Sequence, residues 1–122
     1  HKHSAYVITY ADMPGFSKRE QATLAKLVLA QRGRLAKVAA DLPSEASFAA
    51  KVLCIRIAVL LSRSRRNVDF KRVGLAKINK DFRLSVDAVW LDANSLTDYQ
   101  LRQEAQEWAS VGLRLEIVPT VT

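Results

Sequence analysis

The chain is poor in the residues that build covalent cross-links and metal sites. Cysteine occurs once, at Cys54, and histidine twice, at His1 and His3. A single cysteine excludes an internal disulfide, and its apolar surroundings predict that the thiol packs as a small hydrophobic group in a reducing compartment. A zinc or iron site needs three or four protein ligands at suitable spacing, and these residues do not supply them.

Glycine, aromatic residues and long apolar runs are also scarce. The four glycines are scattered, which excludes a glycine-rich phosphate loop. Only Phe70 lies near the most basic segment, so no platform for stacked bases is predicted. The longest apolar stretch, around residues 52–61, is far shorter than the ~20 residues of a membrane span, and no signal-peptide pattern is present. We therefore expect a cytoplasmic protein that makes no membrane contact.

Positive charge is plentiful and unevenly distributed. The net charge is +7 over 122 residues, of which 49% are hydrophobic, enough for a folded core. Residues 51–72 carry seven Lys and Arg against Asp69 alone, whereas residues 73–122 carry five against seven acidic residues. Such asymmetry indicates an anionic partner, and a solvated basic loop is the alternative. The sequence begins without Met, so we expect a fragment or an excised domain.

The first half of the chain is predicted to be helical. Ser17–Glu20 is a capping-box pattern followed by an apolar stripe through Leu24 and Leu27, which predicts a helix over residues 17–32. Ser44 can cap a second helix that runs to about residue 61 or 63. This second helix is apolar on nearly all sides, which is typical of a central element.

The second half is predicted to be a small β-β-α-β unit, which makes the fold class α+β. Two short β-rich segments, 73–79 and 82–90, flank the turn signal "NKD" and predict a hairpin. Residues 96–112 have helical periodicity, and residues 113–119 alternate as a strand that Pro119 is expected to stop.

One arginine interrupts the apolar second helix. Arg56 cannot lose its charge, so it must meet a carboxylate, several carbonyls or a ligand anion. Arg56 and Arg63 lie at i and i+7 on one side, which Arg66 continues if the helix persists. Guanidinium forks match phosphate oxygens in pairs, so this stripe can form a track for a repeating anion. In the alternative, Arg56 is structural and pairs with Asp12, Asp41 or Glu45.

The segment Ser62–Arg66 leaves a second function open. Its hydroxyls and cations are also typical of nucleic-acid-binding tracts, so an RNA- or other nucleic-acid-binding basic module remains an alternative. No self-sufficient active site is predicted.

The stretches "HKHSAYVITYADMPGFSKREQATLAKLVLAQRGRL" and "LCIRIAVLLSRSRR", followed by "W…LT…L…EA…W…GL", together resemble the C-terminal region of the exopolyphosphatase / guanosine pentaphosphate phosphohydrolase family. The resemblance covers essentially the whole chain. It implies a Mg²⁺-dependent enzyme that removes terminal phosphate, with its active site in N-terminal domains absent from this sequence. It also implies that this part is inactive alone, extends a polyphosphate channel and helps to form a homodimer.

The resemblance further implies a division of the chain and a set of site residues. Residues 1–66 would be the second half of a helical domain similar to the HD phosphohydrolase fold, and residues 67–122 a small α/β domain. Residues 1–11 would be helical despite their strand propensity. Gln31 stands where the family usually has a histidine, and Ser62 stands where a histidine or an asparagine is common. No His-Asp dipeptide occurs, and together these departures argue against an HD-type metal centre. The predicted polyphosphate-binding residues are His3, Arg32, Arg56, Arg63, Arg65 and Arg66.

Overall fold

The computed structural model divides the chain into two units, His1–Val59 and Leu60–Thr122. It describes residues 2–42, 47–63 and 73–121. The division falls within helix α3 (Phe48–Ser62). The boundary expected between residues 66 and 67 lies outside the described residues.

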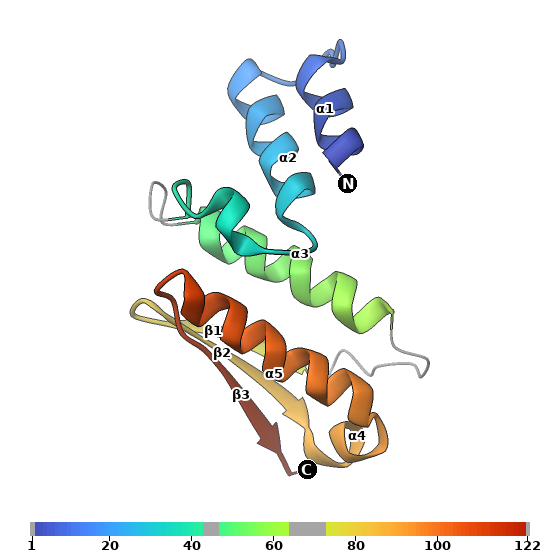
Figure 1. The fold of residues 1–122 in the computed structure, drawn as a ribbon, viewed down its shortest axis with the longest axis vertical. Helices are drawn as coiled ribbons and strands as arrows, with labels where there is room; N and C mark the ends of the chain where they lie inside the picture. The colour runs from blue at the N-terminus through green and yellow to red at the C-terminus, as the bar shows by residue number, and fades with distance from the viewer. Residues whose placement is uncertain (1, 43–46, 64–72, 122) are drawn as a thin grey trace. The chain divides into compact units, whose positions relative to one another are not determined.

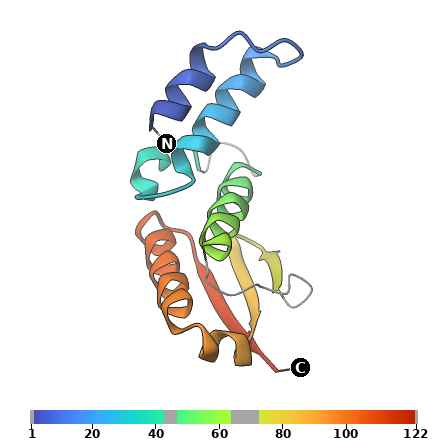
Figure 2. The same ribbon diagram turned by 90° about the vertical axis from the view of Figure 1, so that its right-hand side faces the viewer.

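The first unit is helical. It contains α1 (Lys2–Tyr10), α2 (Lys18–Ala30), the short 3-10 helix η1 (Leu35–Val38) and most of α3. Figures 1 and 2 show α1 and α2 side by side as an antiparallel pair. Helix α1 confirms the helical start that the family resemblance implied, so packing against α2 prevails over local strand propensity.

Helix α2 begins with the predicted capping box. The Glu20 N–H donates to Ser17 Oγ over 3.0 Å, and the Ser17 N–H donates to Glu20 Oε1 over 2.9 Å. The bond from the Ser17 N–H is the main cause that lowers the pKa of the Glu20 carboxyl, and a hydrogen bond with the Ser17 side chain lowers it further. The buried side of α2 differs from the predicted stripe, because Gln21 and Ala25 are buried while Leu24 is only half-buried.

Helix α3 is apolar on most sides but not buried on all of them. Val52, Leu53 and Ile57 are buried, whereas Cys54 is exposed. The prediction that the Cys54 thiol packs in the interior is therefore wrong. Cys54 lies between Lys51 and Ala58 at helical spacing, and all three side chains are exposed on one side of α3. The predicted cap Ser44 lies outside the described residues.

The second unit combines a three-stranded sheet with two helices. Its elements are β1 (Val73–Ile78), β2 (Asp81–Asp87), α4 (Ala88–Ala93), α5 (Ser95–Ser110) and β3 (Leu115–Thr120). The strand order is β1-β2-β3, with β1 antiparallel and β3 parallel to β2. Figures 1 and 2 show α5 along one face of the sheet. The predicted α+β class and the hairpin at Asn79–Lys80 are confirmed.

The core of this unit lies between α5 and the sheet. Phe82, Leu84 and Val86 alternate as the buried residues of β2. Trp108 of α5 is fully buried, and its ring meets Phe82 edge-on with the centroids 5.8 Å apart. The pair therefore anchors α5 to the middle strand.

Two predicted strand ends are wrong. The second strand stops at Asp87, because the Asp87 carboxylate accepts the Trp90 N–H over 3.1 Å and caps α4, so residues 88–90 are helical rather than extended. Pro119 does not stop the last strand, which continues to Thr120. β3 is an edge strand, where a residue without an N–H is tolerated.

Candidate functional site

Arg56 is buried within α3, with 6% of its surface exposed. One of its terminal guanidinium nitrogens donates to the Ala30 carbonyl over 2.9 Å. Ala30 is the last residue of α2, so its carbonyl has no partner within that helix. Arg56 therefore caps α2 through its side chain, which explains why the apolar helix α3 carries a buried cation.

Lys37 supports the same helix end. Its ammonium donates to the Leu29 carbonyl over 3.0 Å and to the Arg32 carbonyl over 2.8 Å. The chain turns between these groups at Gly33, whose φ of 78° favours glycine. Two cations thus neutralise the carbonyl end of α2, where the helix dipole favours positive charge.

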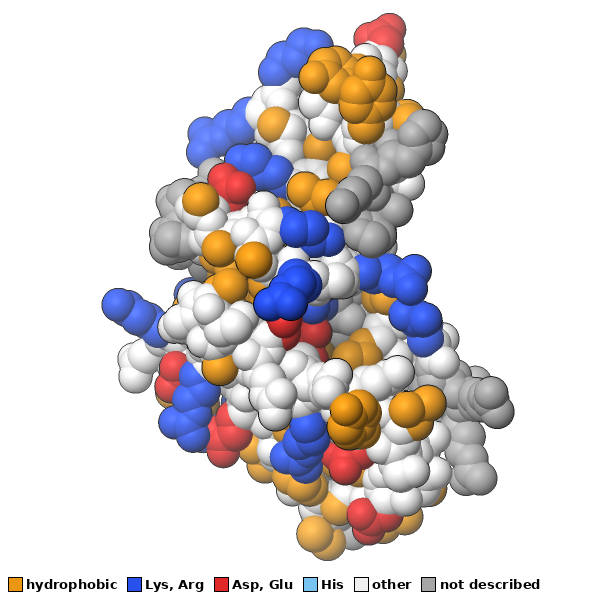
Figure 3. Space-filling view, in the orientation of Figure 1, with side chains coloured by type: hydrophobic (Ala, Val, Ile, Leu, Met, Phe, Trp, Pro, Cys, Tyr) orange, Lys and Arg blue, Asp and Glu red, His pale blue; other side chains and the backbone are white. Residues whose placement is uncertain are grey.

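Two further arginines flank Gly33 and remain exposed. Arg32 and Arg34 present their guanidinium groups to solvent, whereas the neighbouring Lys37 and Arg56 bind main-chain carbonyls. On the face drawn in Figure 3, Lys and Arg side chains gather over the α2 side of the first unit. The arrangement offers guanidinium donors to an external anion.

The structure brings together only part of the predicted set. Arg32 and Arg56 both lie at the end of α2. Arg63 is exposed in the turn that follows α3. His3 belongs to α1, but its side chain is not described, and Arg65 and Arg66 lie outside the described residues. A shared track of guanidinium groups therefore stays a prediction.

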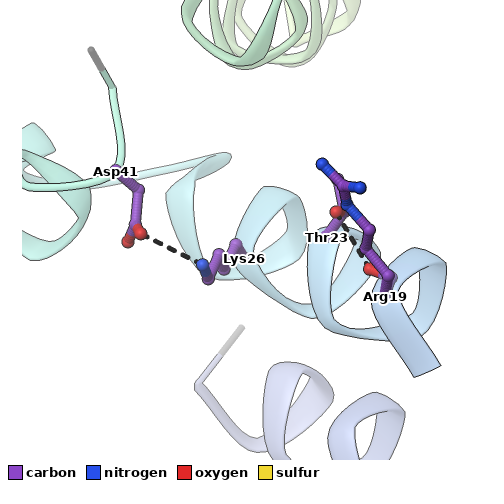
Figure 4. A network of polar contacts seen from close by, with 4 residues as sticks. All are labelled: Arg19, Thr23, Lys26 and Asp41. Atoms are coloured by element: carbon purple, nitrogen blue, oxygen red, sulfur yellow. Dashed lines mark hydrogen bonds and ion pairs between the residues drawn. The ribbon is translucent and has the colours of Figure 1, made fainter. Parts of the chain in front are cut away.

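Two of the three carboxylates proposed as partners of Arg56 lie among the described residues. Asp41 accepts from the Lys26 ammonium over 3.0 Å in a half-exposed ion pair, which Figure 4 shows beside the Thr23–Arg19 bond of α2. Asp12 is exposed, and Glu45 lies outside the described residues.

Gln21 is a buried polar residue whose role the sequence analysis missed. Its amide nitrogen donates to the carbonyls of Ile8, Thr9 and Ala11 over 2.7, 3.2 and 2.7 Å. These carbonyls form the end of α1, so Gln21 caps α1 from α2. Gln21 belongs to the first of the stretches that carry the family resemblance, but periodicity alone gave it no function. Arg34 and Lys37 were missed for the same reason.

In the described part of the second unit, two carboxylates are buried. Asp87 caps α4, and Glu104 accepts from the Trp108 indole nitrogen over 2.8 Å. Across the parts of the chain that the structure describes, no group of three or more His, Cys, Asp and Glu could hold a metal ion. Within the same residues, no helix is long and apolar enough to cross a membrane.

The chain has clear relatives among known proteins. It is similar to three proteins named guanosine-5'-triphosphate,3'-diphosphate pyrophosphatase: 33% identical over 119 residues in Vibrio campbellii, 32% over 118 in Aliivibrio fischeri and 30% over 112 in Photobacterium profundum. These alignments cover 96%, 95% and 91% of the chain, but only 24%, 24% and 22% of the relatives. The chain thus spans about a quarter of their length.

A family assignment agrees with these similarities. Residues 1–105 match the pattern described as Ppx/GppA phosphatase, domain III. The match covers the whole first unit and the second unit as far as α5, and it leaves out the end of α5 and β3. The resemblance inferred from the sequence is confirmed, and the chain belongs to the Ppx/GppA phosphatase family through its domain III.

Proposed function

We propose that this chain binds phosphate-rich anions, inorganic polyphosphate above all, for an enzyme that removes terminal phosphate from polyphosphate or guanosine pentaphosphate. The observation that carries the proposal is the exposure of Arg32 and Arg34 beside the end of α2. Lys37 and Arg56 already bind the carbonyls there, so the exposed guanidinium groups do not have to serve the helix end.

The chemistry of the ligand follows from these groups. Guanidinium donates in pairs to phosphate oxygens and keeps its charge at any physiological pH. A polyphosphate chain repeats that anion at short intervals, so several arginines can act on it together. The excess of basic residues over residues 51–72 and the exposed Arg63 favour the same class of ligand. The relatives' name refers to a nucleotide that bears a triphosphate and a diphosphate.

In this enzyme the chain would bind the phosphate-rich anion, and another part of the protein would carry out catalysis. The catalytic groups, with Mg²⁺, would belong to a part of the enzyme other than this chain. The helical unit would be similar to an HD-type domain, and the chain would help to form a cytoplasmic homodimer. No catalytic residue is assigned here.

A direct test is the binding of polyphosphate of defined length by the purified chain, followed by fluorescence anisotropy. Reversal of the two exposed arginines beside the end of α2, Arg32→Glu with Arg34→Glu, is expected to weaken binding by about 10-fold or more, because phosphate contacts dominate the affinity of such complexes. The matched control is Lys80→Glu with Arg114→Glu, which changes the net charge equally at exposed positions of the second unit.

The control separates a site from a general charge effect. Binding that falls by less than about 3-fold in the control supports a localised site, because the two double variants have the same net charge. Equal losses in both double variants would contradict the proposal, because only net charge would then matter. Circular dichroism spectra that match the unmodified chain establish that both variants are folded.

A further inference from the structure

The first unit carries an apolar groove apart from the arginines at the end of α2. It has a volume of about 450 Å³, and its lining residues are Phe16, Arg19, Glu20, Thr23, Leu24, Leu27 and Lys51. Phe16 precedes α2, five of the others belong to α2, and Lys51 comes from α3. Phe16 is 50% exposed, and Leu24 and Leu27 are half-buried. Three large apolar side chains therefore meet solvent in one hollow.

The groove has an uneven charge. Arg19 and Lys51 are its cations, and both are exposed. Among the described lining residues the acidic one is Glu20, whose Oε1 accepts from the Ser17 N–H over 2.9 Å, so this carboxylate serves the start of α2. Figure 4 shows Arg19 and Thr23 on the same side of α2, one turn apart. The groove thus combines an apolar floor with a positive rim.

The walls decide how a partner can be recognised. All lining residues except Phe16 belong to α2 or α3, so the groove offers no edge of a sheet with which an added strand could pair. The lining positions from Arg19 to Leu27 extend about 12 Å along α2, roughly two turns. That length suits the i, i+3, i+4 and i+7 side chains of a helix laid in a groove.

We propose that this groove binds an amphipathic acidic helix of a partner protein. Leu or Phe side chains of that helix would contact Phe16, Leu24 and Leu27, and its flanking Asp and Glu side chains would face Arg19 and Lys51. Charge complementarity favours an acidic partner over a basic one, and the apolar floor favours a peptide over a nucleic acid.

The test uses a synthetic labelled helix of about 18 residues, with Leu on one stripe and Glu on the remaining positions. The full 122-residue chain is expected to bind it with a Kd of about 10 µM, which corresponds to a free energy of about −7 kcal/mol. A peptide of the same composition with the Leu positions shuffled is expected to bind at least about 10-fold more weakly, since it loses the apolar stripe.

Variants locate the site. Arg19→Glu with Lys51→Glu is expected to weaken binding by about 10-fold, and Leu27→Gln by about 5-fold, because they remove the rim charge and part of the floor. Lys80→Glu with Arg114→Glu, outside the groove, is expected to change the Kd by less than about 2-fold. If Leu27→Gln does not fold, the double variant Arg19→Glu with Lys51→Glu still tests the site, because both residues are exposed.

Four outcomes would overturn the proposal. The first two are that the shuffled peptide, or a peptide with Lys in place of Glu, binds as tightly as the Leu/Glu helix. The third is that Lys80→Glu with Arg114→Glu weakens binding as much as the groove variants do. The fourth is that the chain self-associates and that Arg19→Glu with Lys51→Glu abolishes this association. The last would assign the groove to a second copy of the chain. No phosphate enters the assay, so its failure leaves the proposed polyphosphate binding untouched.

Discussion

Arg56 shows how a single permanent charge is accommodated inside a helical unit. Its guanidinium donates to the carbonyl of Ala30, where α2 has run out of internal partners. A buried donor and a buried acceptor satisfy each other, and neither has to lose its hydrogen bonding on leaving water.

Arg56→Ala is therefore expected to lower the free energy of unfolding by about 2–3 kcal/mol. The Ala30 carbonyl loses a charged donor, and the shortened side chain leaves a cavity. Urea denaturation followed by circular dichroism measures the change. Arg102→Ala is the matched control, since Arg102 forms only a half-exposed i,i+4 pair with Asp98 and its loss should cost about 0.5 kcal/mol. Equal midpoints for Arg56→Ala and the unmodified chain would contradict the capping role.

Gln21 has the same kind of role at the end of α1. Gln21→Leu keeps the size of the side chain but removes the donor shared by three carbonyls, so it is expected to cost about 1–3 kcal/mol. Gln103→Leu makes the same exchange at an exposed position, where a change within about 0.5 kcal/mol is expected. If thermal unfolding shows the two variants equally stable, Gln21 does not hold α1 to α2.

At the scale of elements, the two ends of α2 are capped by different kinds of contact. Its start is fixed by neighbours in sequence, Ser17 and Glu20, whereas its end is fixed by Lys37 and Arg56. The first kind of contact is local and therefore has a sequence pattern. The second depends on residues that come together only in the folded unit.

The capping box makes the stability of α2 depend on pH. The folded state lowers the pKa of Glu20 below its usual 4.5, so its contribution is complete above the unfolded pKa and disappears as the pH falls through the folded pKa. Glu20→Gln is expected to be less stable than the unmodified chain at pH 7, and the difference should shrink between about pH 5 and pH 3. If the difference in melting temperature between Glu20→Gln and the unmodified chain stays constant across this range, the Glu20 carboxylate does not stabilise α2.

This contrast explains how much of the fold was predictable. The capping box, the helical start, the hairpin at Asn79 and the helix that holds Trp108 all follow from local pattern or family resemblance. The errors at Asp87 and Pro119 concern single residues whose effect depends on a side-chain bond or on an edge position in the sheet.

The site was less predictable than the fold. A stripe of arginines can be read from spacing, but periodicity does not say that Arg56 meets a carbonyl while Arg32 stays exposed. That choice depends on the path of the chain between α2 and α3. The interior position expected for Cys54 failed for a related reason, because an apolar helix can still present one side to solvent.

At the scale of the whole molecule, the chain combines a helical unit with a small α/β unit, and the family match covers the first unit and part of the second. Its positive charge is concentrated in residues 51–72, while the last fifty residues are slightly acidic. Such a distribution favours a localised contact with a polyanion over uniform attraction.

A competition titration tests this account most directly. Labelled polyphosphate bound to the chain is challenged with single-stranded RNA or with unlabelled polyphosphate at equal phosphate concentration and fixed salt, because both complexes weaken with salt. The account predicts that polyphosphate displaces the label at least about 10-fold better than RNA, since guanidinium groups without a stacking platform recognise phosphate and not bases. RNA that competes equally well or better would contradict it.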